Sequence, residues 1–197
     1  MDRYGIDFET EPVVIAVEQP LPLDLPRLLA LTGESGAGKS TLLRAAARDL
    51  RDRGARVVDL DDLTLGTRPV IDRIGGSLDD AIATLSRCGL GEARLMLRLP
   101  SELSEGQRYR LRLALAVDAL RETGGWIVAD EFTATLDRTL AKVLARNVHR
   151  LAQPGRLGFV LATTHEDILP DLAPHTHVHC RLDEQPLVHT ADQPPAA

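Results

Sequence analysis

Nine consecutive residues carry the clearest chemical signal in the chain. They are Gly33, Glu34, Ser35, Gly36, Ala37, Gly38, Lys39, Ser40 and Thr41, and they match the pattern G-x-x-x-x-G-K-[ST] at every fixed position. Glycines let backbone N–H groups turn inward around a phosphate, because a β-carbon would obstruct that approach. The pattern predicts a nucleotide site in which Lys39 contacts the β- and γ-phosphates and the Ser40 hydroxyl binds Mg²⁺.

A second pattern is an apolar run, residues 126–129, that ends in two carboxylates. We expect a buried strand that delivers Asp130 to the phosphate loop as the second Mg²⁺ ligand. Glu131 follows on the same strand end and is predicted to polarise the water that attacks the γ-phosphate. A strand followed by an acidic helix cap is the structural alternative.

The elements that must position these residues alternate between strand and helix. Strands are expected at 13–17, 28–31, 56–60, 126–129 and 158–162, helices from residue 40 and over 78–88, 105–121 and 138–152, and a closing hairpin at 175–188. The phosphate loop then lies between a strand and a helix, as its chemistry requires. The predicted fold class is α/β, a P-loop NTPase core with a mostly parallel sheet flanked by helices, plus a small helical subdomain.

Residues 103–107, with the sequence LSEGQ, open the predicted helix over 105–121. With this segment the chain resembles the ABC ATPase superfamily, whose signature is LSxGQ just upstream of a D-E strand. Residues 134–137 resemble the D-loop of that family, and His165 resembles its switch histidine. The resemblance runs from about residue 12 to about residue 182 and implies that ATP and Mg²⁺ are the cofactors. The chain is also similar to stand-alone bacterial and archaeal ABC-type ATPases, some of them fused to an acetyltransferase domain.

The resemblance assigns roles to residues outside the phosphate loop. Ser104, Gly106 and Gln107 are expected to belong to the nucleotide-binding set, and in this superfamily that cradle serves the ATP of a second subunit. Asp137 is expected to communicate across the interface, and His165 to hydrogen-bond the γ-phosphate. The implied partner is a second ABC ATPase subunit in an ATP-sandwich dimer, either a second copy of this chain or a different ABC chain.

Two positions depart from the family pattern. The lid loop of ABC ATPases presents a glutamine to Mg²⁺ and water, but no glutamine occurs between Gln19 and Gln107. We expect residues 68–73 to be the equivalent stretch and Asp72 to take the vacant place as a metal ligand; a helix cap is the structural alternative. For the aromatic residue that stacks on the base, Phe8 is predicted, with Tyr4 as the alternative.

Composition limits the class of protein. The 197 residues are 44% hydrophobic, enough for one core of ordinary size, so a single domain over 1–197 is expected, with a helical subdomain at 66–122 and a disordered tail at 192–197. No apolar run reaches the ~20 residues that span a bilayer, and the N-terminal residues lack a signal-peptide pattern. A cytoplasmic protein without direct membrane insertion is expected.

Three functions remain open at this point. The leading one is Mg²⁺-dependent ATP hydrolysis by a dimer that acts on something other than a transporter, with a protein or nucleic acid as its load. The missing lid glutamine and the short helical segment argue against the second, the ATP-binding subunit of a membrane transporter. The third is a nucleic-acid-associated clamp without coiled-coil arms, since only about 60 residues separate the phosphate loop from LSEGQ. The net charge of −6 argues against a basic surface over the whole molecule.

Two weaker patterns have simpler explanations. The arginines of residues 44–53 could hold a phosphodiester backbone, but aspartates interrupt them and favour a solvated, ion-paired helix face. His175, His177 and His179 alternate and would share one face of a strand. A metal site is one interpretation of these histidines, and an exposed hairpin face is the other.

Overall fold

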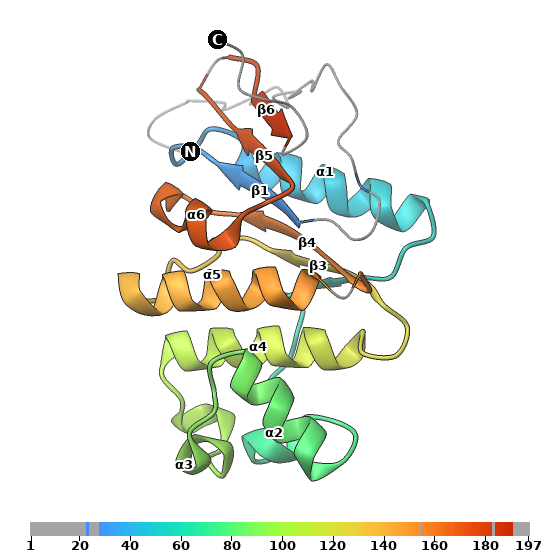
Figure 1. The fold of residues 1–197 in the computed structure, drawn as a ribbon, viewed down its shortest axis with the longest axis vertical. Coiled ribbons are helices and arrows are strands. Elements are labelled where there is room, and N and C mark those ends of the chain that lie inside the picture. Colours follow the sequence, from blue (N-terminus) through green and yellow to red (C-terminus); the bar gives the residue numbers. More distant parts are fainter. Residues whose placement is uncertain (1–22, 24–27, 154, 183, 191–197) are drawn as a thin grey trace, which may run out of the picture.

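The strands form one sheet in the order β2-β3-β4-β1-β5-β6 (Figure 1). The computed structural model describes residue 23 and residues 28–153, 155–182 and 184–190 of the chain. The strand bounds are β1 Leu28–Thr32, β2 Val57–Asp59, β3 Gly125–Ala129, β4 Leu157–Ala162, β5 Thr176–His179 and β6 Leu187–Thr190. Neighbouring strands run parallel except β5 and β6, which form the expected antiparallel hairpin.

Helices follow most of the strands. Their bounds are α1 Lys39–Asp52, α2 Leu78–Arg87, α3 Ala93–Met96, α4 Glu105–Ala119, α5 Arg138–Ala152 and α6 Leu169–Leu172, with 3₁₀ turns η1 Val70–Arg73, η2 Pro100–Glu102 and η3 Glu166–Ile168. These bounds agree with the sequence-based expectations to within two residues at most ends. The expected strand at 13–17 and the tail at 192–197 lie outside the described residues.

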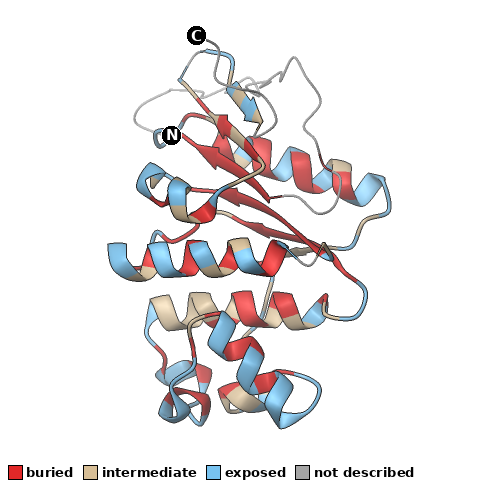
Figure 2. Ribbon diagram, in the orientation of Figure 1, coloured by how far each residue is buried: buried red, intermediate tan, exposed pale blue. Residues whose placement is uncertain are grey.

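Alternate residues of the central strands pack on the two faces of the sheet. Leu29 and Leu31 of β1 share a hydrophobic cluster with α1, whereas Leu28 and Ala30 share the other cluster with α4 and α5. All five residues of β1 are buried (Figure 2), as expected for a parallel strand covered on both faces. The α/β fold with a mostly parallel sheet flanked by helices is therefore confirmed.

All of the regular elements between β2 and β3 are helices or 3₁₀ turns. In Figure 1, α5, α4 and then α2 follow one another away from the sheet, and residues of all three share one cluster. Ser77 caps α2 by accepting a hydrogen bond from the Asp80 backbone, while the Asp80 carboxylate accepts from the Ser77 N–H. The helical subdomain is predicted in this segment. That it forms a separate subdomain stays a prediction.

Candidate nucleotide-binding site

The loop between β1 and α1 is held in shape by its own lysine. Lys39 is buried, and its Nζ donates hydrogen bonds to the carbonyl oxygens of Gly33, at 2.8 Å, and Glu34, at 2.7 Å. Gly38 caps α1 with φ at +85°, a left-handed conformation that favours glycine. The sequence thus places an ammonium group and a helix N-terminus at the end of the same short loop.

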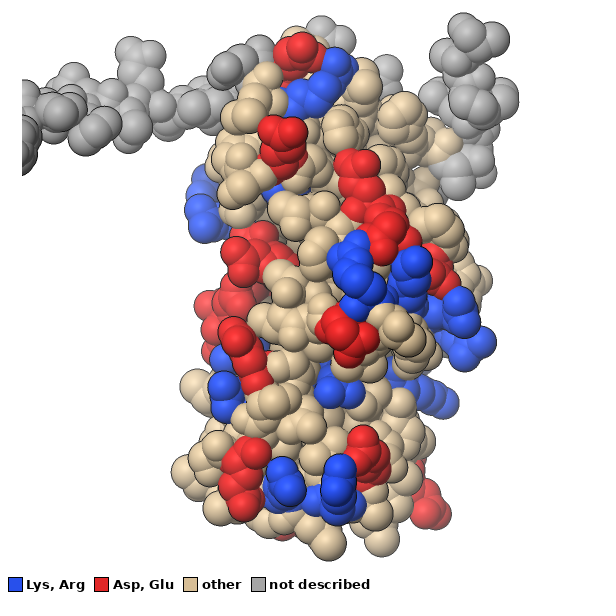
Figure 3. Space-filling model, turned by 90° about the vertical axis from the view of Figure 1, so that its left-hand side faces the viewer, with Lys and Arg blue, Asp and Glu red and all other residues tan. Residues whose placement is uncertain are grey.

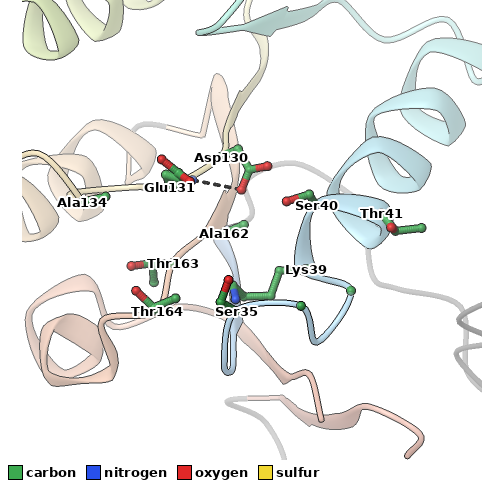
Figure 4. Close-up of a pocket in the computed structure, with 12 residues that line it drawn as sticks. Ser35, Lys39, Ser40, Thr41, Asp130, Glu131, Ala134, Ala162, Thr163 and Thr164 are labelled. Atoms are coloured by element: carbon green, nitrogen blue, oxygen red, sulfur yellow. Dashed lines mark hydrogen bonds between the residues drawn. The ribbon is translucent and has the colours of Figure 1, made fainter. Parts of the chain in front are cut away.

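A cavity of about 350 Å³ lies over this loop (Figure 4), and it is called the P-loop cavity below. It brings together the two patterns that the sequence singled out, because β4 lies between β1 and β3 and all three strands end at the same edge. Its lining residues are Ser35, Gly36, Gly38, Lys39, Ser40, Thr41, Asp130, Glu131, Ala134, Ala162, Thr163 and Thr164. Lysine, hydroxyl and carboxylate groups thus converge in one small space.

Asp130 and Glu131 enter the cavity at the end of β3. The Glu131 backbone N–H donates to the Asp130 carboxylate at 2.9 Å, which turns that oxygen back toward its own strand end. Glu131 has φ at +48° and Thr133 has φ at +68°, both uncommon for residues with a side chain. Such backbone strain costs of the order of 1–3 kcal/mol per residue and is concentrated at functional sites. The strained turn therefore agrees with a catalytic use of Glu131.

His165 follows β4 and is held by two threonines. Its backbone N–H donates to Thr163 Oγ1 at 3.0 Å, and its Nδ1 lies 3.3 Å from Thr133 Oγ1. Burial lowers the pKa of His165, and the nearby Arg138 guanidinium lowers it further, so the ring is neutral at pH 7. His165 is next in sequence to the cavity residue Thr164 but does not itself line the cavity. Its contact with the γ-phosphate stays a prediction.

Residues 103–107, the signature segment, lie outside the P-loop cavity. Ser104 is exposed and caps α4: its Oγ accepts from the Gln107 N–H at 3.3 Å, and the Gln107 amide oxygen accepts from the Ser104 N–H at 2.9 Å. A β-carbon on Gly106 would lie 2.8 Å from a Leu136 methyl carbon and 3.1 Å from the Thr135 carbonyl oxygen. Packing within this chain therefore favours glycine at 106, because a larger residue would displace the Leu136 side chain and crowd the Thr135 carbonyl.

The remaining predicted site residues occupy separate places. Asp137 caps α5, accepting from the Leu140 N–H at 2.9 Å, and is exposed. Asp72 is an exposed residue of η1 and does not line the P-loop cavity, so its role as a metal ligand stays a prediction. Phe8 and Tyr4 lie outside the described residues.

Carboxylates at the end of β2 are site candidates that the sequence reasoning missed. β2 pairs with β3 so that Asp59 lies opposite Val128, two residues before Asp130. Burial raises the pKa of Asp59, and the pKa of the buried Tyr109 hydroxyl is raised first by burial and then by the charges of Asp61 and Asp130. These groups therefore lie near the end of β3, where Asp130 is the predicted Mg²⁺ ligand. The signal was present in the sequence, because an acidic run directly follows the predicted strand at 56–60.

The alternating histidines of β5 and of the residue before it make structural contacts. His177 Nε2 lies 2.8 Å from Thr32 Oγ1, His179 Nδ1 lies 3.2 Å from the same hydroxyl, and His175 Nδ1 accepts from the Leu28 N–H. No cluster of three or more His, Cys, Asp or Glu side chains suited to a metal ion occurs among the residues that the structure describes. The metal interpretation of these histidines has no support in that part of the chain.

The fold and the cavity together define a P-loop nucleotide-binding protein. A family model described as an AAA domain matches residues 24–170. The hemin import ATP-binding protein HmuV of Myxococcus xanthus is 30% identical over 182 residues, which cover 74% of this chain and 67% of HmuV. The cytochrome c biogenesis ATP-binding export protein CcmA of Rhizobium meliloti is 32% identical over 171 residues, 71% of this chain and 78% of CcmA.

Solved structures show the same fold. The ATP-binding cassette MJ0796, in a dimeric post-hydrolysis state bound to ADP and Pi, superposes with a TM-score of 0.65 at 18% identity, over 85% of this chain and 87% of that one. A second dimeric structure of MJ0796, described as a bacterial ABC transporter cassette, gives a TM-score of 0.64 over 86% and 88% of the two chains.

The chain belongs to the ABC superfamily of ATPases. It is an ABC-type ATP hydrolase, and its cofactors are ATP and Mg²⁺. The residues present fit both: the Ser40 hydroxyl and the Asp130 carboxylate are the hard oxygen ligands that Mg²⁺ prefers, and Lys39 supplies a cation for phosphate. No helix within the described ranges has the length and apolarity to cross a membrane.

Proposed function

We propose that the chain hydrolyses ATP between two subunits, each nucleotide held by the P-loop cavity of one and the signature segment of the other. One observation carries this proposal. Lys39, Ser40, Asp130 and Glu131 all line the P-loop cavity, whereas the signature segment lies outside it and Ser104 is exposed. A single chain thus presents two incomplete halves, and a head-to-tail pair of chains would complete both.

Catalysis by these residues would be mostly positioning and charge stabilisation. Lys39 would exchange its loop carbonyls for phosphate oxygens, and bound Mg²⁺ would neutralise phosphate charge while held by Ser40 and Asp130. Glu131 would orient the attacking water and accept its proton. His165, neutral and fixed by Thr133 and Thr163, would hydrogen-bond the γ-phosphate.

The mass of the chain in solution tests the proposal. Wild type and Glu131→Gln are compared by light scattering with and without Mg-ATP, alongside phosphate release. We expect Glu131→Gln to double its mass with Mg-ATP and to lose hydrolysis, because binding is kept while the base is removed. Glu122→Gln removes the same charge from an exposed position outside the P-loop cavity and is the control. Undiminished hydrolysis by Glu131→Gln would contradict the assigned base.

A monomeric, inert wild type would contradict self-assembly and point to a different ABC chain as the second subunit. In that case the wild type is mixed with cell extract and Mg-ATP, and the bound chain is identified by mass spectrometry. A homodimer remains the proposal because this chain carries both the phosphate loop and the signature segment.

The ATPase could drive a membrane transporter or act on another protein or nucleic acid, and each alternative has one observation in its favour. The relatives are named for hemin import and for export in cytochrome c biogenesis, which favours the ATP-binding subunit of a membrane transporter. The absence of glutamine between residues 19 and 107 favours a load other than a transporter. A cytoplasmic location suits either. Flotation of the tagged chain with membranes in high salt, together with an integral membrane protein, supports the transporter; recovery in the soluble fraction supports the other load.

The nucleic-acid clamp has no specific observation in its favour. Arg53 pairs with Asp49 at 2.7 Å on α1, as expected for an ion-paired helix face. The face in Figure 3, which holds the β1–α1 loop at the left of Figure 1, carries acidic and basic side chains intermixed. A continuous basic track for a phosphodiester backbone is not seen on this face.

A further inference from the structure

A second cavity, of about 550 Å³, lies at the opposite edge of the sheet from the P-loop cavity. It is formed where α4 and α5 end and β4 begins, at the right of Figure 1. Among the described residues, the two cavities share no lining residue. The phosphate loop follows the carboxyl end of β1, whereas Leu157 of the second cavity is the first residue of β4. The second cavity is therefore separate from the nucleotide site.

Four arginines line the second cavity, which is called the arginine pocket below. They are Arg87 of α2, Arg121 just after α4, Arg150 of α5 and Arg156 just before β4. They come from separate elements, so no helical repeat accounts for their meeting. In a chain with a net charge of −6, four arginines in the lining of one cavity are a local excess of basic residues.

No carboxylate side chain lines the arginine pocket within the described part of the chain. Arg121 lies 3.6 Å from the Asp118 carboxylate and donates to the Gly75 carbonyl, and Arg156 donates to the Glu122 carbonyl. For Arg87 and Arg150, no ion pair or hydrogen bond to another described residue is found. Arg87, Arg150 and Arg156 are exposed, so two of the arginines that line the pocket, Arg87 and Arg150, are free to meet a ligand from solvent.

Helix ends alone do not explain these arginines. Cations are favoured at helix C-termini, where the backbone contributes about half a negative charge that falls off within the last turn. Three such ends and one aspartate still leave the four guanidinium groups with an excess of positive charge. Arg156 lies before β4 and not at a helix C-terminus, so the helix dipoles do not account for it.

The floor of the arginine pocket is apolar. Leu120, Leu151 and Leu157 are buried and line it, together with the side chain of Val117. A volume of about 550 Å³ falls in the range of small-molecule sites, which combine an apolar lining with a few placed polar groups. Guanidinium groups bind phosphate, carboxylate and sulfonate oxygens in pairs and also stack on flat rings.

From this arrangement we infer that the arginine pocket binds a small organic anion with an apolar body and one or more phosphate, carboxylate or sulfonate groups. The apolar body lies on the leucine floor, and the anionic groups are held by Arg87 and Arg150. Because the lining comes from α2 on one side and from α5 and β4 on the other, the ligand bridges the helical segment and the sheet. This inference does not depend on the proposed function.

A pair of fluorescent probes tests the inference on the full chain. 8-Anilinonaphthalene-1-sulfonate has an aromatic body and one sulfonate, and N-phenyl-1-naphthylamine has the same rings without the charge. Both are titrated with Mg-ADP present at saturation, so that the P-loop cavity is occupied. We expect the sulfonate probe to bind one site per chain and the neutral probe to bind at least about tenfold more weakly, since the charge-assisted bonds are lost.

Matched variants locate the site. Arg87→Ala with Arg150→Ala is expected to weaken binding of the sulfonate probe by about tenfold or more. The control, Arg44→Ala with Arg48→Ala, removes the same charge from exposed positions on α1 and should bind like wild type. Thermal unfolding shows whether each variant is folded. Asn147→Phe, which fills the pocket and keeps all four arginines, should also lose the probe and serves if the double variant does not fold.

Three results would overturn the inference. The first is equal binding of the sulfonate probe by the pocket variants and the control. The second is equal affinity for the neutral probe, which would show an apolar cavity only. The third is displacement of the sulfonate probe by a poly-glutamate peptide but not by naphthalene-1-sulfonate, which would assign the pocket to an acidic protein segment.

Discussion

The P-loop cavity and the signature segment contain the same kinds of groups but use them differently. In the cavity, the hydroxyl, ammonium and carboxylate groups of Ser40, Lys39 and Asp130 face a shared space. In the signature segment, the Ser104 hydroxyl and the Gln107 amide satisfy the first N–H groups of α4 and face solvent. This difference is the basis of our proposal that a complete site combines both regions from two subunits.

The largest effect is expected from removing the charge in the P-loop cavity. Lys39→Ala should lower kcat/KM for ATP by at least about 100-fold, because the ammonium group that lines the cavity is lost. Phosphate release and binding of a fluorescent ATP analogue measure the effect. Lys142→Ala, on the exposed face of α5, is the control and should keep wild-type activity. Near-normal turnover by Lys39→Ala would contradict the assignment of the P-loop cavity as the phosphate-binding half of the site.

Mixing two inactive variants tests whether the halves act in trans. Ser104→Arg should be inactive alone, because the hydroxyl proposed to contact the ATP of the second subunit is lost from both sites. Mixed in equal amounts with Lys39→Ala, it should recover activity up to about a quarter of wild type, since a mixed dimer has one intact site and forms half of the time at random. Absence of recovery, with both variants folded and mixed dimers detected, would mean that each chain completes its own site.

An intermediate effect is expected at two carboxylates that are candidate metal ligands: Asp72, predicted in place of the lid glutamine, and Asp61, at the end of β2. Asp61→Asn and Asp72→Asn are compared, with kcat measured at several Mg²⁺ concentrations. If carboxylates at the end of β2 help Asp130 to hold Mg²⁺, Asp61→Asn should lower kcat by about tenfold. Asp72→Asn should then change kcat by less than about twofold. The opposite ranking would support Asp72 as the metal ligand and place the lid at residues 68–73.

The smallest effect concerns His165 and pH. Its folded-state pKa lies below the ordinary value of 6.5, so the unfolded chain takes up a proton near that pH before the folded chain does. The free energy of unfolding should therefore fall as the pH decreases from 6.5 toward the lowered pKa. Urea unfolding at pH 7.5 and 5.5 should show a smaller decrease for His165→Asn than for wild type. An equal decrease would assign the pH dependence to other groups, such as His177, whose pKa is also lowered by burial.

The sequence predicted well the features that depend on short-range pattern. The phosphate loop, the apolar strand before Asp130 and the helix after Ser104 are each encoded by adjacent residues, and the structure has them where the patterns indicated. The metal-side carboxylates were harder to place, because Asp59 comes close to Asp130 only through the pairing of β2 with β3, which no local pattern specifies. The convergence of four arginines at the ends of α2, α4 and α5 is likewise a product of tertiary packing.

The close fit at Gly106 has a consequence for cooperativity. The start of α4 packs on the Thr135 carbonyl and on Leu136 closely enough that a single added carbon would displace the Leu136 side chain. Thr135 and Leu136 directly follow Ala134, which lines the same chain's P-loop cavity. In the proposed dimer, a nucleotide that displaces the signature segment of one subunit would therefore press on the turn beside that subunit's own ATP. Binding of one ATP in a dimer would then be coupled to binding of the other through these side-chain contacts. The rate of hydrolysis should rise with ATP concentration more steeply than independent sites allow.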